Sequence, residues 1–237
     1  MRSTVRATFD DQPPRFAQIP KRTGGVRRIT VLGAADDAAY RRVVTRLAAT
    51  IEKALGPEVL ANRIASRPAL TLRPWKPSWR GFLRARGDVA RRGRVLLRAD
   101  VKECYPSIGP RTVERTLDRL GAERVDVREL TRLLERFQEL GVVGLPVGPE
   151  PSAVLANAAL ISVDDAFRRA RCPHVRWVDD VWAAVGGIER VEGILERLRG
   201  ALAPLGLSLN EEKTIVLETR EAGVCLGAEM PSGWVGH

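Results

Sequence analysis

Two adjacent carboxylates, Asp179 and Asp180, lie inside the otherwise apolar stretch RWVDDVWAAV at residues 176–185. The short apolar runs on either side predict a tight hairpin that presents both acids at one end of a sheet. Like charges this close raise one another's pKa unless a cation compensates them. A divalent metal is the natural compensation, because Mg²⁺ prefers carboxylate oxygens and retains substrate phosphates. The alternative is that the pair serves only as a turn, a common use of aspartate.

A third acid, Asp100, ends the apolar run RVLLRADV at residues 94–101, and a Pro-Ser turn soon follows. Such an acid can share metal ions with the Asp179-Asp180 pair if the two strands are neighbours. Two metals about 4 Å apart, bridged by carboxylates, stabilise both the attacking and the leaving oxygen in phosphoryl transfer. Taken alone, Asp100 would be interpreted as a turn or helix cap, so the metal hypothesis depends on the combination.

The elements that would position these acids follow from hydrophobic periodicity. Helices are predicted over residues 34–56, 109–121, 126–141 and 187–206, around 78–92, and as one long helix within 144–170. Strands are predicted over 94–101, 174–178, 181–185, 207–219 and 222–230, with a hairpin over 21–33 that turns at Thr23-Gly24-Gly25. Residues 1–20 are expected to be an irregular arm. Helices alternating with few strands predict an α+β fold with an antiparallel hairpin at the centre of the sheet.

Charge is divided unevenly along the chain, whose formal net charge is +10. Residues 1–99 hold 22 Lys/Arg against 7 Asp/Glu, whereas residues 100–237 hold 17 against 22. A basic lobe joined to an acidic one favours a polyanionic partner. An arginine-rich composition would explain the many cations, but not why acids avoid the first lobe.

Neither a membrane nor an oxidising compartment is indicated. No apolar run approaches the ~20 residues needed to cross a bilayer, and the first residues contain no apolar core of a signal peptide. The three cysteines are far apart and fit neither a disulfide framework nor a zinc site. We therefore expect a cytoplasmic protein without membrane contact.

Six motifs together resemble those of the reverse transcriptases. DVKECYPSI (100–108) resembles the first palm motif, GLPVGPEPSAVLAN (144–157) the loop–helix motif, and RWVDDV (176–181) the aromatic-x-Asp-Asp hairpin. The segments LSLNEEKT, VCLGAEM and KRTGGVRRI resemble the lysine motif, the Leu-Gly hairpin and the fingers hairpin. They occur in the family's order over roughly residues 18–230. Trp177 replaces the usual Tyr or Phe, and Val147 stands where Gln is usual. GLPVGPEPS and RWVDDVW are most similar to bacterial enzymes of the abortive-infection and phage-defence type.

The resemblance implies a right-hand polymerase fold. It implies an α+β palm with fingers, an antiparallel palm sheet packed on helices, and a thumb that is missing or minimal. A basic arm and fingers would span residues 1–99 and the palm residues 100–237, with fingers elements interleaved around 109–145. A homo-oligomer, or a partner protein or RNA, would then replace the thumb.

The resemblance also assigns roles to individual residues. Asp100, Asp179 and Asp180 would be the catalytic acids and would bind two Mg²⁺ ions, for which Mn²⁺ is a substitute, together with the backbone carbonyl of Val101. The nucleotide-binding residues would be Lys21, Arg27 with Arg28 as its competitor, Tyr105, Gly148 and Lys213.

Most of the nucleotide-binding residues have a plainer alternative. Tyr105 would exclude a 2′-hydroxyl from the site, or it is ordinary core packing. Lys21 and Arg27 would hold the triphosphate, or they belong to a solvated basic hairpin. Lys213 would lie near the leaving pyrophosphate, or it is a surface lysine. Gly148 would let the template or nucleotide approach the backbone closely.

The implied function is metal-dependent addition of dNTPs to a DNA 3′ end on an RNA template, with bacterial anti-phage defence as a possible setting. RNA template, DNA product and dNTPs are the expected partners. Two alternatives stay open. One is template-independent or protein-primed DNA synthesis. The other is a non-catalytic scaffold or sensor that binds nucleic acid.

Overall fold

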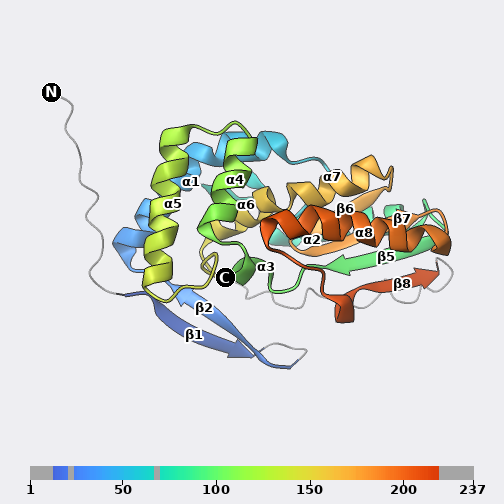
Figure 1. Cartoon of the computed structure of the whole chain (residues 1–237), viewed down its shortest axis with the longest axis horizontal. Coiled ribbons are helices and arrows are strands. Elements are labelled where there is room, and N and C mark those ends of the chain that lie inside the picture. The colour runs from blue at the N-terminus through green and yellow to red at the C-terminus, as the bar shows by residue number, and fades with distance from the viewer. Residues whose placement is uncertain (1–12, 21–23, 67–69, 219–237) are drawn as a thin grey trace.

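The computed structural model describes residues 13–20, 24–66 and 70–218. Its main sheet has the strand order β6-β7-β5-β8, and all neighbouring strands are antiparallel (Figure 1). The strands are β5 (Val95–Asp100), β6 (His174–Trp177), β7 (Asp180–Val185) and β8 (Ile215–Glu218). The hairpin of β6 and β7 was predicted at the centre of the sheet. It lies instead at one edge, because β5 and β8 both follow β7 in the strand order and no strand of the described residues pairs with the outer side of β6.

Strand β5 separates the two parts of the hydrophobic core. Val95, Leu97 and Ala99 face the larger buried cluster, and Leu96, between Val95 and Leu97, faces the smaller one. Successive side chains of a strand point to opposite faces, so a strand covered on both faces has a nearly continuous apolar sequence. This burial explains the run VLL that predicted the strand.

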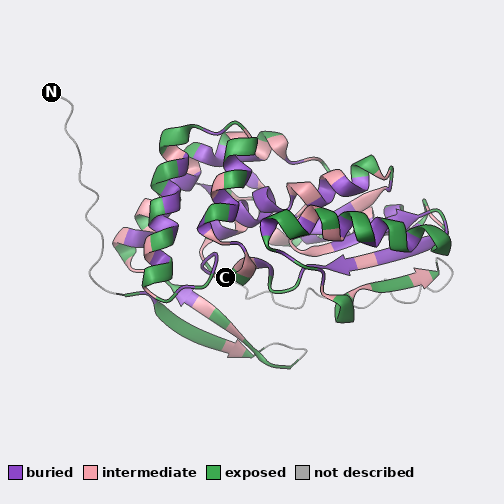
Figure 2. Ribbon diagram, in the orientation of Figure 1, coloured by how far each residue is buried: buried purple, intermediate pink, exposed green. Residues whose placement is uncertain are grey.

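Helices cover both faces of the sheet. The larger cluster is built with α1 (Ala34–Ala54), α4 (Pro110–Arg119), α5 (Arg124–Glu139), α6 (Glu150–Ala159), α7 (Ile161–Arg169) and α8 (Val191–Leu202). Helix α2 (Trp75–Ala90) contacts β6 and β7 and supplies the smaller cluster. The helices bury one side and expose the other (Figure 2). The predicted α+β fold, an antiparallel sheet packed on helices, is confirmed.

A second pair of strands projects from the end of the molecule where α1 and α5 lie (Figure 1). Strand β1 (Arg15–Pro20) pairs with β2 (Val26–Val31) in an antiparallel hairpin. The predicted turn glycines Gly24 and Gly25 have φ of +88° and +77°. The expected irregular arm is wrong for residues 15–20, since pairing with β2 makes them a strand despite the nearby prolines. A shorter pair, β3 (Ile64–Ser66) and β4 (Thr71–Leu72), follows α1.

Three predicted elements have different boundaries. The long helix within 144–170 is two helices, because the chain turns at the buried Leu160, which follows α6 with φ −83° and ψ 2°. The strand predicted over 207–219 is reduced to β8, preceded by the short 3₁₀ helix η3 (Glu211–Lys213). The helix predicted over 187–206 has 3₁₀ turns at both ends, η1 (Ile188–Arg190) and η2 (Ala203–Leu205). The strand predicted over 222–230 lies outside the described residues.

The helices in the described ranges are all too short or too polar to cross a membrane.

Candidate active site

The antiparallel register brings the three predicted acids to one end of the main sheet. Asp100, the last residue of β5, is the direct partner of Asp180, the first residue of β7. Trp177 pairs with Asp180, which leaves Val178 and Asp179 as the connection between β6 and β7. The predicted connection is therefore displaced by one residue, since Asp180 already belongs to the strand. Like charges directly opposite each other destabilise a pair of strands, so this arrangement requires a compensating cation.

Asp179 carries the most perturbed carboxyl group of the three. Burial, together with the charges of Asp100 and Asp180, raises the pKa of Asp179 to about 7, although Lys213 opposes this. Without a metal, such a group is partly protonated at neutral pH. It is therefore the acid whose charge is least well compensated by the protein.

Asp100 is buried and is held from one side. Asn210 Nδ2 donates to Asp100 Oδ1 at 3.0 Å, and Lys213 Nζ lies 3.5 Å from the same oxygen. Burial raises the pKa of Asp100, while Lys213 and Asn210 act to lower it. Lys213 thus lies next to Asp100, and its predicted role near the leaving pyrophosphate stays a prediction. Asn210 was missed, although it stands three residues before Lys213 in the same motif.

Asp180 has a counter-charge of its own. Arg98 Nε donates to Asp180 Oδ1 at 2.9 Å, and Trp182 Nε1 donates to Asp180 Oδ2 at 3.2 Å. The Arg98 guanidinium also lies 5.2 Å from the centre of the Trp182 ring. Arg98 was not predicted. Its signal was present, because Arg98 and Asp100 are two positions apart on one strand and so share a face.

The donor set suits a hard divalent cation. It consists of the carboxylates of Asp100, Asp179 and Asp180. Lys213 forms an ion pair with Asp100, and Arg98 forms one with Asp180. Oxygen donors of this kind are the ones that Mg²⁺ prefers. Val101, whose carbonyl was predicted as a further ligand, directly follows Asp100 and forms a bridge to the segment before η3. The residues present therefore fit metal binding.

Tyr105 lies beside the acids in the short helix α3 (Cys104–Ser107). Burial raises the pKa of Tyr105, the charge of Asp179 adds to this and the charge of Arg27 opposes it. The phenol of Tyr105 therefore stays protonated, and it lies within electrostatic reach of Asp179 and Arg27. Its carbonyl accepts a hydrogen bond from Leu145 N–H at 2.9 Å. Gly144, with φ +63°, packs so closely that a Cβ there would lie 2.4 Å from the Tyr105 carbonyl oxygen. Gly144 was missed, and the gate role of Tyr105 stays a prediction.

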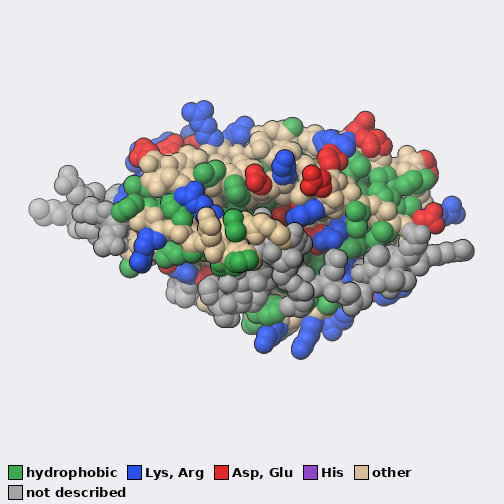
Figure 3. All heavy atoms as spheres, turned by 90° about the horizontal axis from the view of Figure 1, so that it is seen from below, with side chains coloured by type: hydrophobic (Ala, Val, Ile, Leu, Met, Phe, Trp, Pro, Cys, Tyr) green, Lys and Arg blue, Asp and Glu red, His purple; other side chains and the backbone are tan. Residues whose placement is uncertain are grey.

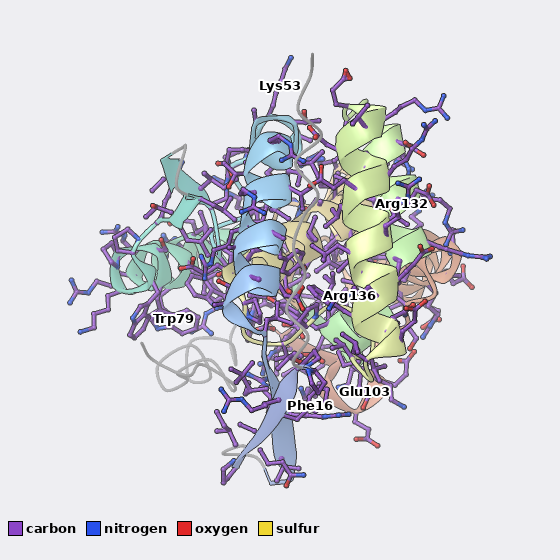
Figure 4. All side chains as sticks on the ribbon, turned by 90° about the vertical axis from the view of Figure 1, so that its left-hand side faces the viewer. Phe16, Lys53, Trp79, Glu103, Arg132 and Arg136 are labelled. Carbon is purple, nitrogen blue, oxygen red and sulfur yellow. The ribbon has the colours of Figure 1, made fainter. Side chains whose placement is uncertain are left out.

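The structure separates Arg27 from its competitor Arg28. They are adjacent on β2 and so point to opposite faces. Arg28 lies over the ring of Phe16, 3.5 Å from its centre, and Phe16 belongs to the projecting hairpin (Figure 4). Arg27 is half-buried, and its charge acts on Tyr105. Arg27 therefore lies on the face of the hairpin that is within electrostatic reach of Tyr105. Lys21 lies outside the described residues, so its role stays a prediction.

Gly148 makes a close approach, but to the protein itself. Its φ is +123°, and a Cβ there would lie 3.0 Å from Ile29 Cγ2 on β2. Next to it, Thr30 N–H donates to the Val147 carbonyl at 2.8 Å. The loop before α6 is therefore docked on the hairpin of β1 and β2. A role of Gly148 towards a nucleotide or template stays a prediction.

A buried polar network beneath the Val178-Asp179 turn was not predicted. Arg176 of β6 is 0 % exposed and binds both oxygens of Asp164 on α7, at 2.8 and 2.7 Å. Its Nη1 donates to Asn157 Oδ1 at 3.0 Å and to the Val178 carbonyl at 2.9 Å. Burial alone would raise the pKa of Asp164, but Arg176 brings it below its ordinary value. The signal was an arginine in an apolar strand. Its partners could not be read from the sequence.

Asp164 also belongs to a second group of possible metal ligands, together with Glu58 and His174. Their ligand atoms all lie within 4.8 Å of one another. Two guanidinium groups already compensate this group, since Arg176 binds Asp164 and Arg168 binds Glu58. A metal ion would meet both positive charges, so we assign the group a structural role.

Solved structures with a similar fold include telomerases. Telomerase from Candida albicans in a complex with a TWJ fragment of telomeric RNA is 16 % identical, with a TM-score of 0.54 over 88 % of this chain and 42 % of that one. Apo telomerase from Candida tropicalis is 14 % identical, with a TM-score of 0.55 over 89 % and 45 %. A form truncated from its C-terminal domain is 14 % identical, with a TM-score of 0.53 over 89 % and 51 %. This chain thus spans about half the length of these telomerases, and the likeness establishes the fold.

Sequence comparison establishes the family. No curated protein matches the chain. The model of the family described as reverse transcriptase (RNA-dependent DNA polymerase) matches residues 19–230. This match covers most of the chain and includes Asp100, Asp179 and Asp180. The chain therefore belongs to the reverse transcriptase (RNA-dependent DNA polymerase) family.

Proposed function

We propose that this chain is a metal-dependent DNA polymerase of the reverse-transcriptase type, which adds dNTPs to a DNA 3′ end on an RNA template. The observation that carries the proposal is the convergence of Asp100, Asp179 and Asp180 at one end of the sheet. Membership of the family supports the reaction class. A telomerase solved with telomeric RNA has the same fold, which supports an RNA template.

The site residues then have distinct tasks. Two divalent ions, Mg²⁺ or Mn²⁺, would supply Lewis-acid activation of the 3′-hydroxyl and neutralise the triphosphate. Asp100, Asp179, Asp180 and the Val101 carbonyl are the groups that would hold them. Most of the catalytic contribution of the protein is positioning and charge compensation, as phosphoryl transfer requires.

The cationic and aromatic residues around the acids would select and hold the nucleotide. Lys213, already beside Asp100, would offset the charge of the leaving pyrophosphate. Arg27 would bind triphosphate oxygens through its planar guanidinium. The ring of Tyr105 would occupy the space of a 2′-hydroxyl, so deoxynucleotides would be preferred. The similarity to defence-type enzymes supports a cytoplasmic anti-phage setting as the biological context.

A primer-extension assay tests the proposal. The purified chain, given Mg²⁺, labelled dNTPs and a DNA primer on an RNA template, should extend the primer. Asp100→Asn and Asp179→Asn should each lower the rate by at least about 100-fold, the scale expected when an essential charge-stabilising group is lost. The control is Asp118→Asn, which removes an exposed carboxylate from α4 and should leave the rate unchanged.

Two results would contradict the proposal. Incorporation that does not depend on added template or primer would favour template-independent or protein-primed synthesis. Nucleic-acid binding without incorporation, in both Mg²⁺ and Mn²⁺, would favour a non-catalytic scaffold.

A further inference from the structure

The turn that carries Asp179 has an unfavourable backbone conformation. Val178, the residue before it, has φ +57°. This is the left-handed region, which a β-branched residue adopts only when its surroundings impose it. Since the orientation of Asp179 follows directly from the conformation of Val178, whatever holds Val178 also sets the position of the catalytic acid.

Arg176 supplies that constraint from below the turn. Its Nη1 donates to the Val178 carbonyl at 2.9 Å. The same guanidinium is anchored to two helices, by Asn157 of α6 at 3.0 Å and by both oxygens of Asp164 of α7. The side chains of Arg176 and Asp164 are both 0 % exposed. The turn is thus connected to the helical layer through a single rigid and planar group.

The backbone adds a further attachment. Arg176 N–H donates to the Glu58 carbonyl at 2.9 Å, and Leu60 N–H donates to the Arg176 carbonyl at 3.2 Å. Asn157 Nδ2 in turn donates to the Ala61 carbonyl at 2.9 Å. Arg176 is therefore immobilised by α6, by α7 and by the segment after α1.

We infer that Arg176 is a positioning residue that holds Val178 in its left-handed conformation and thereby fixes the Asp179 carboxylate for metal binding. Asp164 and Asn157 are its anchors. The inference rests on the proposed function, because it assigns Asp179 to the metal site. It does not require that Arg176 touches substrate or metal.

The test compares two substitutions with a matched control. Arg176→Met removes the guanidinium, and Arg176→Lys keeps a positive charge beside Asp164 while losing the planar fork. The control is Arg136→Met, which removes the cation from an ion pair with another fully buried acid. Arg136 on α5 points towards α1 (Figure 4), where its Nη1 lies 2.5 Å from Oδ1 of the fully buried Asp36. Each variant is examined for thermal stability, for Mn²⁺ binding by electron paramagnetic resonance, and for kcat and KM.

Both Arg176 variants should weaken Mn²⁺ binding by at least about tenfold, a typical effect of removing a group that orients a metal ligand. The value of kcat should fall while KM for dNTP stays within about twofold, because the fingers residues are unchanged. Arg136→Met should lose stability with wild-type Mn²⁺ affinity. Adding Val178→Gly to Arg176→Met should restore part of the affinity, since glycine adopts positive φ without support.

The inference fails if a folded Arg176 variant binds Mn²⁺ as the wild type does, or if Arg136→Met weakens Mn²⁺ binding equally. Arg176→Lys keeps the test decisive if Arg176→Met does not fold. The proposed function fails on a different result, the absence of nucleotide incorporation by a wild-type chain whose Mn²⁺ binding depends on Asp179.

Discussion

At the level of single residues, the site is a set of three acids, and among the described residues two cations form ion pairs with them. Lys213 contacts Asp100, and Arg98 contacts Asp180. Asp179 is left with a carboxyl group whose pKa is raised to about 7. Binding of a metal ion would therefore release a proton from Asp179, so metal affinity should depend on pH.

This imbalance predicts how stability depends on pH in the metal-free chain. The pKa of Asp179 is raised in the folded state, to about 7, from about 3.9 in the unfolded state. The folded state thus binds the proton more tightly, and stability falls as pH rises from about 4 to about 7. Asp179→Asn removes this loss. Without metal, it should raise the melting temperature at about pH 8 and much less at about pH 5.

The measurement is thermal unfolding in the presence of a chelator, with Asp118→Asn on the surface of α4 as the control. Calorimetry supplies a second check, because the affinity for Mn²⁺ should increase with pH up to about 7 and then level off. A stabilisation by Asp179→Asn that is equal at both pH values would show that the raised pKa is not its cause.

At the level of elements, the site depends on the close approach between helix α3 and the loop that contains Gly144. Helix α3 carries Tyr105, and its position is set by the loop that contains Gly144. A Cβ on Gly144 would lie 2.3 Å from the Pro106 carbonyl oxygen and 2.4 Å from that of Tyr105. Both contacts are with backbone atoms, so no side chain can move aside to relieve them.

Gly144→Ala should therefore destabilise the chain and displace Tyr105. The positive φ costs roughly 1–2 kcal/mol for a residue with a Cβ, and the overlap adds about 1–3 kcal/mol. The matched control is Gly121→Ala, because Gly121 has φ +71° and nothing within 4 Å of an added Cβ. Denaturant unfolding should show the backbone cost alone for Gly121→Ala and the larger loss for Gly144→Ala. Equal losses would contradict the contact.

The hairpin of β1 and β2 allows a second comparison at this scale. Arg27 and Arg28 differ in the face they occupy and hardly at all in chemistry. Arg27→Ala should raise KM for dNTP by about tenfold or more, as expected when a charged hydrogen bond of about 1.5–3 kcal/mol is lost. Arg28→Ala should leave KM unchanged, since Arg28 covers Phe16. Steady-state kinetics of both variants decides the assignment, and a larger effect of Arg28→Ala would reverse it.

The elements differ in how far the sequence alone could predict them. Helix α1 was predictable because its apolar pattern has a clear helical period, and strand β5 because it is a short, continuous apolar run. The break at Leu160 was not, because the apolar pattern continues across it while the chain changes direction. The displacement of the Asp179-Asp180 turn by one residue depends on strand register, which single-residue patterns do not determine.

The site residues follow the same division. Asp100, Asp179, Asp180 and Lys213 could be predicted because their motifs are local. Arg98 and Asn210 could not be assigned, because their role appears only once β5, β7 and η3 are brought together. Arg176 needs Asp164 and Asn157, which lie on two different helices.

For the whole molecule, the distribution of charge points to where a polyanion would bind. On the face seen in Figure 3, several Lys and Arg side chains project along the lower edge, and others are spread over the rest of the face. Helix α2 has an exposed row of three cations, Lys76, Arg80 and Arg84, spaced four residues apart and thus aligned on one side. Its opposite side packs through Trp79 on Trp177, the residue that pairs with Asp180. This contact connects α2 to the end of the sheet that carries Asp179 and Asp180.

Helix α5 provides a matched comparison. Arg124, Arg128 and Arg132 are also exposed and four residues apart, but α5 carries four acids, whereas α2 carries only Asp88. Helix α5 packs on α1 and α4 (Figure 1), at the end of the molecule away from the main sheet. The positive and negative charges of α5 nearly cancel, so this helix should contribute little to binding a phosphate backbone.

Replacing the three cations of α2 with glutamine should therefore weaken nucleic-acid binding and reduce its dependence on salt. Each phosphate contact contributes about 0.7–0.9 to the slope of log K against log salt concentration, so the slope should fall by about 2. The equivalent triple substitution on α5 removes the same charge and should leave the slope unchanged. Fluorescence anisotropy with a primer on an RNA template, measured over a range of salt concentrations, gives both slopes. If both triple variants lower the slope equally, net charge and not the position of α2 governs binding, because an evenly spread field loses the same attraction wherever three charges are removed.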